Sequence, residues 1–108
     1  MDLHIKDRLL LPSLLPERGS FMEYNLKKAI LKKIAISEQD KTDYEIVEKP
    51  EEKRIEWNVL KDQETPLKVD FSKEELAFMR KACENVSEQE LPDEIWVVAE
   101  RIYNESQD

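Results

Sequence analysis

The spacing of hydrophobic residues predicts a chain that begins and ends in helices and has strands between them. In residues 21–36 the apolar positions Leu26, Ile30 and Ile34 recur every four residues, which is typical of a helix that is buried on one face. Ser20 precedes this segment and is a good N-cap residue. We therefore expect the clearest helix of the first half to begin directly after Ser20.

Two shorter segments flank this helix. Residues 3–11 are predicted to form a short strand or extended lead-in and then a broken helix that ends near Leu11, because Pro12 would interrupt a longer one. A turn is predicted at 14–20, where proline and glycine residues are found. After the long helix, Ser37 is a second N-cap candidate, and we expect a short acidic helical segment to end near Asp43.

The hydrophobic period then changes to two, which predicts strands. Residues 44–49 and 54–59 alternate between apolar and polar positions and are joined by a charged tip at 50–53, so we expect a β-hairpin. Residues 61–66 are polar and are expected to form a loop. Strict alternation in 67–71 predicts a third strand.

Two helices are predicted in the C-terminal part, one after Ser72 and one near Pro92. Their buried stripes are expected to be Leu76, Met79, Cys83 and Val86 in the first, and Ile95, Val98, Ala99 and Ile102 in the second. The central core residues are expected to be Leu26, Ile30, Ile34, Leu76, Met79 and Ile102. The tail is expected to fray from about Asn104.

These elements predict one α+β domain over residues 1–108. It would have about four helices and a small antiparallel sheet made of the hairpin plus one strand. Helices followed by a hairpin also make the N-terminal half resemble a winged helix in element order.

The low counts of cysteine, histidine and glycine exclude most classes of catalytic and metal-binding site. The chain has one cysteine, one histidine and one glycine. A zinc site with nitrogen and sulfur ligands would have only His4 and Cys83 to use, and His4 lies near a chain end, where segments are usually poorly held. Gly19 alone cannot make a glycine-rich phosphate loop. We expect no catalytic, cofactor-binding or metal-binding residues, and we interpret Cys83 as a small buried apolar residue.

Charge narrows the range of partners. The formal net charge is -8, and no stretch is apolar and long enough to span a bilayer, so we expect a cytoplasmic protein that does not bind membranes. The first 35 residues nevertheless carry more Lys and Arg than Asp and Glu. The basic residues expected on the solvent face of the first long helix are Lys27, Lys28, Lys32 and Lys33. They are candidates for contact with an acidic partner, or they are ordinary solvated side chains.

The winged-helix order makes nucleic-acid binding the alternative function, carried by the same basic helix face. The segment in the recognition position argues against it, since Glu38, Asp40 and Asp43 outnumber Lys41. A helix that reads DNA normally offers cations and amides to phosphates and base edges. We therefore do not expect nucleic acid to be the partner.

Two tryptophans are the aromatic candidates for an interface. Trp57 lies at the end of the predicted hairpin and Trp96 in the last helix. Tryptophan is enriched at binding hot spots, but a small domain with few aromatic residues also needs them in its core. Both readings remain open for each residue.

The N-terminal third also carries a loose pattern, R-L-x-L-x-x-x-L-P-x-x-G-S/N-F, which residues 8–21 match. With the amphipathic helix and a hairpin ending in Ile55-Glu56-Trp57-Asn58, the chain resembles a group of small uncharacterised proteins of phage and prophage genomes. The resemblance implies a phage or mobile-element origin and an accessory role in the cytoplasm. It implies no activity and no catalytic residues.

The sequence therefore favours a non-enzymatic protein-interaction module without a cofactor. Its partner is expected to be a protein, and a second copy of the chain is one candidate. The nucleic-acid-binding regulator is kept as the alternative.

Overall fold

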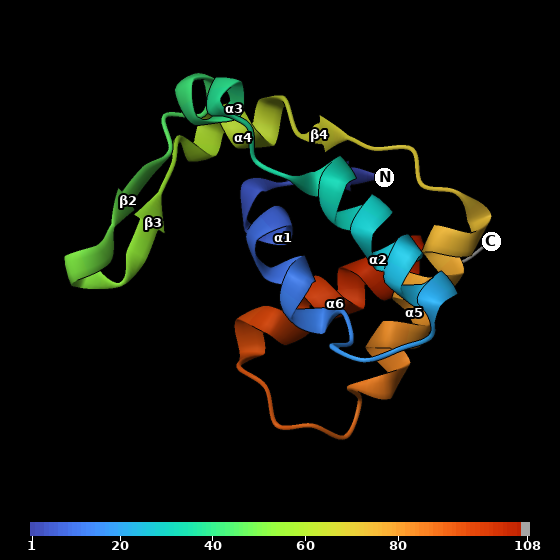
Figure 1. Cartoon of the computed structure of the whole chain (residues 1–108). Coiled ribbons are helices and arrows are strands. Elements are labelled where there is room, and N and C mark those ends of the chain that lie inside the picture. The colour runs from blue at the N-terminus through green and yellow to red at the C-terminus, as the bar shows by residue number, and fades with distance from the viewer. Residues whose placement is uncertain (107–108) are drawn as a thin grey trace.

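A body of helices from which one β-hairpin extends makes up residues 1–106, the part that the computed structural model describes (Figure 1). Six α-helices lie within these residues: α1 (Ile5–Leu10), α2 (Phe21–Ile34), α3 (Glu38–Asp43), α4 (Val59–Glu64), α5 (Lys73–Asn85) and α6 (Asp93–Glu105). The strands are β1 (Asp2–Leu3), β2 (Val47–Lys49), β3 (Arg54–Glu56) and β4 (Leu67–Lys68), and 3₁₀ turns cover Leu11–Leu14 (η1) and Pro50–Glu52 (η2). The predicted α+β class is confirmed.

The strands form two separate antiparallel pairs within residues 1–106, β1 with β4 and β2 with β3. We expected the third strand to extend the hairpin, but β4 instead pairs with the start of the chain. The terminal ammonium of Met1 donates to the carbonyl of Val69 at 3.0 Å, and the Val69 amide donates back to Met1 at 2.9 Å. The N-terminus is therefore firmly held.

Helix α4 explains why β4 is separated from the hairpin. A loop was predicted for residues 61–66, and this prediction is wrong. The Asn58 side chain accepts a hydrogen bond from the amide of Lys61 at 3.1 Å, which caps a helical turn directly after the hairpin. The helix ends at Glu64, before Pro66, and it redirects the chain toward β1.

The serines at the predicted helix starts are N-caps, and each forms a capping box. The Ser20 hydroxyl accepts from the Glu23 amide while the Glu23 carboxylate accepts from the Ser20 amide, and Ser72 with Glu75 repeats the pattern at the start of α5. Helix α6 begins directly after Pro92 and ends at Glu105. Fraying from about Asn104 stays a prediction. The predicted tail also includes residues 107–108, which lie outside the described residues.

The core lies where η1, α2, α5 and α6 pack together. Four of the six expected core residues are almost completely buried: Ile30, Ile34, Met79 and Ile102. The other two, Leu26 and Leu76, are partly buried and pack against the same cluster. The four-residue spacing in the sequence therefore identifies the correct buried face of α2.

Cys83 is buried next to α6, as predicted. Burial is the main reason that the pKa of its thiol is raised to about 11, and the Glu84 carboxylate raises it further. The sulfur atom lies 3.6 Å from the carbonyl oxygen of Ala99. The thiol is therefore protonated at neutral pH and packs as a small apolar group.

Within residues 1–106, no helix has both the length and the apolar character that crossing a membrane would require.

Candidate functional site

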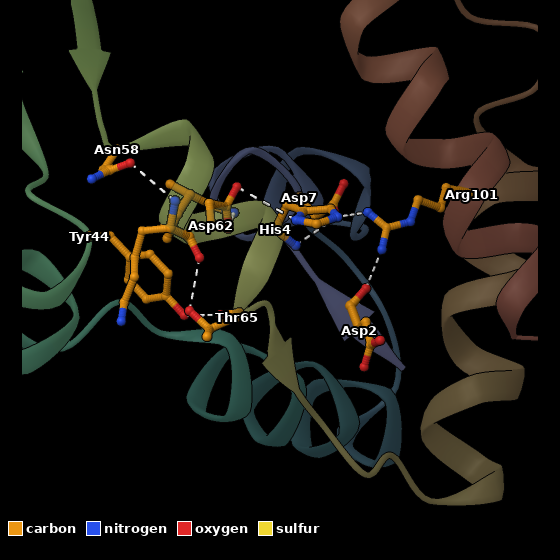
Figure 2. Close-up of polar contacts among 10 residues, drawn as sticks. Asp2, His4, Asp7, Tyr44, Asn58, Asp62, Thr65 and Arg101 are labelled. Carbon is orange, nitrogen blue, oxygen red and sulfur yellow. Dashed lines mark hydrogen bonds and ion pairs between the residues drawn. The ribbon is translucent and has the colours of Figure 1, made fainter.

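A buried polar network surrounds the start of α1 (Figure 2). The Asp62 carboxylate of α4 is buried and accepts a hydrogen bond from the Ile5 amide at 3.0 Å, which caps the first turn of α1. Its other oxygen lies 3.6 Å from Nδ1 of His4. The expectation that a histidine so near the chain end is poorly held is therefore wrong.

The same network joins α1 to α6. The Asp7 carboxylate is buried and accepts from the His4 amide at 2.9 Å. It also accepts from the guanidinium of Arg101, which in turn donates to the backbone carbonyl of Asp2. Asp7 thus links α1, in which it lies, to Arg101 of α6.

The chemistry open to this network is limited by what surrounds the imidazole. A histidine beside a buried carboxylate can act as a general base when a hydroxyl or thiol lies within hydrogen-bond reach. Among residues 1–106 no serine, threonine or cysteine side chain donates to His4, and no group of three metal-ligating side chains is found. Asp7 accepts from the His4 amide and Asp62 from the Ile5 amide, so both carboxylates cap the first turn of α1.

Arg8 of α1 forms a second buried polar contact, with the C-terminal end of α2. Its Nε donates to the carbonyl of Ile34 at 3.0 Å, and its Nη2 donates to the carbonyl of Ala35 and to the Asp40 carboxylate, each at 2.6 Å. These carbonyls belong to the last turn of α2, where no helical amide is left to bond them. Arg8 therefore caps α2 and holds α3 against it.

The four lysines predicted on the solvent face of α2 do not act as one group. Lys27 is half-buried, and its Nζ donates to the carbonyl of Pro16 at 3.0 Å. Lys28 lies over the Tyr24 ring, with Nζ 5.6 Å from the ring centroid. Lys32 is exposed and makes no hydrogen bond or ion pair to any residue in 1–106.

Lys33 points toward α5 instead. Its Nζ lies 2.5 Å from the buried carboxylate of Glu75 and 3.0 Å from the carbonyl of Asp70. Burial alone would raise the pKa of Glu75 and is the largest influence, but the bonds from Lys33 and Ser72 together outweigh it and hold the pKa below 4.5. Lys33 is exposed, as expected, but its ammonium is already engaged by Glu75 and Asp70.

Replacing Lys33 with glutamine is expected to lower the free energy of unfolding by about 1 kcal/mol at pH 7, since the pair is partly exposed. The lowered pKa of Glu75 stabilises the fold above the pKa of the unfolded chain, and this contribution is lost as the pH falls through the folded value. The difference between wild type and variant should therefore shrink below about pH 4.5.

Urea unfolding between pH 3 and pH 7 measures this difference. Lys32→Gln is the matched control and should change stability by less than about 0.5 kcal/mol at every pH, because Lys32 is exposed on the same helix. Equal losses for both variants would contradict the role assigned to the ion pair with Glu75.

The exposed face of α2 carries aromatic residues that the sequence analysis did not identify. The side chains of Phe21 and Tyr24 are 79% and 55% exposed, and their rings stack with centroids 6.5 Å apart. Together with Lys28 and Lys32 they occupy positions i, i+3, i+7 and i+11, which lie along one side of a helix. We call Phe21, Tyr24, Lys28 and Lys32 the α2 stripe. Helical spacing alone could have identified these four residues as one exposed side of the helix, since their positions lie opposite the buried Ile30 and Ile34.

The loop before α2 shapes the end of this stripe. A hollow of about 240 Å³ beside Tyr24 is lined by Pro16, Glu17, Arg18, Gly19, Glu23, Tyr24, Lys27 and Phe78. A side chain at Gly19 would bring its Cβ within 3.0 Å of the Cβ of Glu23, so glycine allows the loop to lie close to the helix. The stripe therefore has a hollow beside its aromatic end.

The two tryptophans lie on other elements. Trp57 is half-buried directly after β3, at the base of the hairpin. Trp96 of α6 is also half-buried, packs against the core, and lines a hollow between α5 and α6 with Cys83 and Tyr103. The structure does not bring the lysines and the tryptophans together into one site.

Comparisons with known proteins add no relative. No protein-family model matches this chain, and no curated protein or solved structure matches it. The resemblance to phage-encoded proteins stays a prediction.

Proposed function

We propose that the protein is a non-enzymatic interaction module that binds an acidic protein segment through the α2 stripe. One observation carries this proposal: two stacked aromatic rings are exposed next to two lysines in a chain whose net charge is -8. Large exposed aromatic side chains are costly to leave in water and are common anchors of interfaces. The stripe combines such anchors with a charge opposite to that of the molecule as a whole.

The chemistry of the stripe indicates the partner. Phe21 and Tyr24 offer apolar surface, whereas Lys28 and Lys32 lie one and two turns further along and attract carboxylates. A partner that places an apolar side chain against the rings and acidic residues one or two turns away would match both. An amphipathic acidic helix meets this requirement.

Nucleic-acid binding is less well supported by the same contacts. Two of the four lysines considered, Lys27 and Lys33, already bind groups of the protein itself. Affinity for DNA depends on the number of cations that contact phosphates. The stripe offers two, and neighbouring α3 adds the acidic residues Glu38 and Asp43.

A photo-crosslinking amino acid at position 21, introduced in the native host, tests the proposal. We expect one defined protein to crosslink from this position, with an acidic crosslinked peptide identified by mass spectrometry. The additional change Lys28→Glu with Lys32→Glu should reduce the yield at least tenfold, because it repels carboxylates. The same crosslinker at Val97, which is exposed on α6, is the control and should not capture that protein.

Two results would overturn the proposal. One is the absence of any protein that depends on both position 21 and the two lysines. The other is a salt-sensitive complex of the wild type with a short DNA duplex that Lys28→Gln with Lys32→Gln weakens, with the log–log salt slope reduced by about 0.9 for each lost phosphate contact.

A further inference from the structure

The β2–β3 hairpin extends away from the helical body and pairs with no further strand in residues 1–106 (Figure 1). Its register sets Val47 opposite Glu56, Glu48 opposite Ile55 and Lys49 opposite Arg54. A two-stranded hairpin is only marginally stable in water, and each outer edge presents unpaired backbone groups. The hairpin is therefore the part of this fold best suited to add strands from another chain.

The two faces of the hairpin differ. One face is charged and held by ion pairs: Lys49 to Glu56 at 3.1 Å and Arg54 to Glu56 at 2.8 Å. The other face carries Ile55 opposite Glu48, and strand alternation places Trp57 on the same side as Ile55. Ile55 and Trp57 are only half-buried. An extended sheet would cover more of these two side chains than the hairpin does alone.

The sequence of β3 is complementary to itself. If two copies of β3 run antiparallel about a twofold axis at Ile55, the two Ile55 side chains face each other. Arg54 of each copy then lies opposite Glu56 of the second copy, so two ion pairs form across the axis.

The other edge lacks this property. The same operation on β2 at Glu48 would set two carboxylates directly opposite each other, which is unfavourable. An axis at Val47 would set Ile46 opposite Glu48 of the second copy, which forms no ion pair across the axis. Charge complementarity therefore selects β3.

We propose that the free edge of β3 pairs with β3 of a second copy of this chain, which joins the two hairpins into one four-stranded antiparallel sheet. The closed twofold arrangement uses the one free edge of β3 in each copy and leaves the α2 stripe of each copy available. The proposal is thus independent of the function proposed for that stripe. An interface of one short strand per copy falls in the small, transient class, so the dimer is expected to be weak.

Sedimentation equilibrium of the full chain at about 10 µM to 1 mM, a range chosen for a weak dimer, tests this proposal. The wild type should change from monomer to dimer across the range. Arg54→Glu should raise the dissociation constant at least about tenfold, since it places carboxylates opposite each other twice. The double variant Arg54→Glu with Glu56→Arg should restore association, because the charges are exchanged across the axis.

The single variant should not unfold the hairpin. Lys49 lies opposite position 54 within the same hairpin, so a carboxylate there gains an intramolecular partner. Lys81→Glu on α5 changes the net charge equally and is the control that should leave association unchanged, since Lys81 is exposed on another element. Amide exchange in β3 should slow with increasing protein concentration in the wild type and in Lys81→Glu, but not in Arg54→Glu.

Three outcomes would overturn the proposal. The wild type could be monomeric at every concentration, its dimer could be insensitive to Arg54→Glu, or the double variant could fail to recover association while its circular dichroism matches the wild type. A dimer that is weakened by Phe21→Ser instead would assign the contact to α2 and equally exclude the β3 edge.

Discussion

Replacing Arg8 with methionine is expected to lower the free energy of unfolding by about 3–5 kcal/mol. Methionine approximates the length of the arginine stem but cannot donate. The carbonyls of Ile34 and Ala35 and the Asp40 carboxylate would each lose a hydrogen bond in a site where Arg8 is 4% exposed. Removing one member of a buried charged pair costs far more than the pair contributes in exposed positions.

Urea denaturation followed by circular dichroism measures this loss. Arg18→Met is the matched control, because Arg18 is exposed and the same substitution there should cost less than about 0.5 kcal/mol. A loss below 1 kcal/mol for Arg8→Met would show that water replaces the guanidinium without penalty, and that the cap of α2 is not what holds α3 in place.

The pH dependence of this contact has a defined direction. Burial raises the pKa of Asp40 and is the largest influence, but the bonds from Ser37 and Arg8 together hold it below its usual value. The ionised carboxylate therefore stabilises the fold above the pKa of the unfolded chain, and this contribution is lost in acid. The effect of Arg8→Met should accordingly be smaller at pH 3 than at pH 7.

Local signals in the sequence were sufficient for the helix starts. Ser20, Ser37 and Ser72 each satisfy backbone amides within three residues of themselves, so nothing distant in the chain can change the outcome. The buried faces of α2 and α6 were equally accessible, because a helical period repeats within one segment. In α5 the predicted stripe includes the buried Met79 and Cys83 but omits the buried Phe78 and Ala82.

Contacts between distant segments account for what the sequence did not predict. Pairing of β4 with β1 joins residues more than sixty positions apart, and no local pattern in Leu67–Lys68 distinguishes it from a third hairpin strand. Helix α4 was missed because Asn58 follows Trp57 in a run that alternates like a strand, although its side chain caps a helix. In both cases tertiary packing determined the local structure.

Contacts between distant segments also decide which charged residues of the candidate site face solvent and which bind other parts of the protein. Lys28 and Lys33 are both lysines on one amphipathic helix, but Lys28 faces solvent over Tyr24 and Lys33 binds buried Glu75. Spacing placed both outside the apolar stripe and could not reveal a carboxylate 42 positions later in the chain. Arg8 and Asp62 were missed for this reason too, since each bonds the backbone of another element.

Replacing Ile30 with alanine is expected to destabilise the protein by about 2–5 kcal/mol, because it removes three carbon atoms from a side chain that is completely buried. Ile30 belongs to the cluster in which α2 packs against α5 and α6, so the surrounding helices can close the cavity only in part. Urea unfolding of the full chain measures the change, and Ile30→Val should cost only about 0.5–1.5 kcal/mol.

Phe21→Ala is the informative control for the same helix, because it removes a larger side chain from a position that is 79% exposed. Its cost to stability should be below about 0.5 kcal/mol, whereas it should weaken binding of the partner proposed for the α2 stripe, measured with the purified partner. Stability and binding are then carried by opposite faces of one helix. A loss below 0.5 kcal/mol for Ile30→Ala, or a larger loss for Phe21→Ala, would show that the buried face of α2 has been assigned to the wrong side.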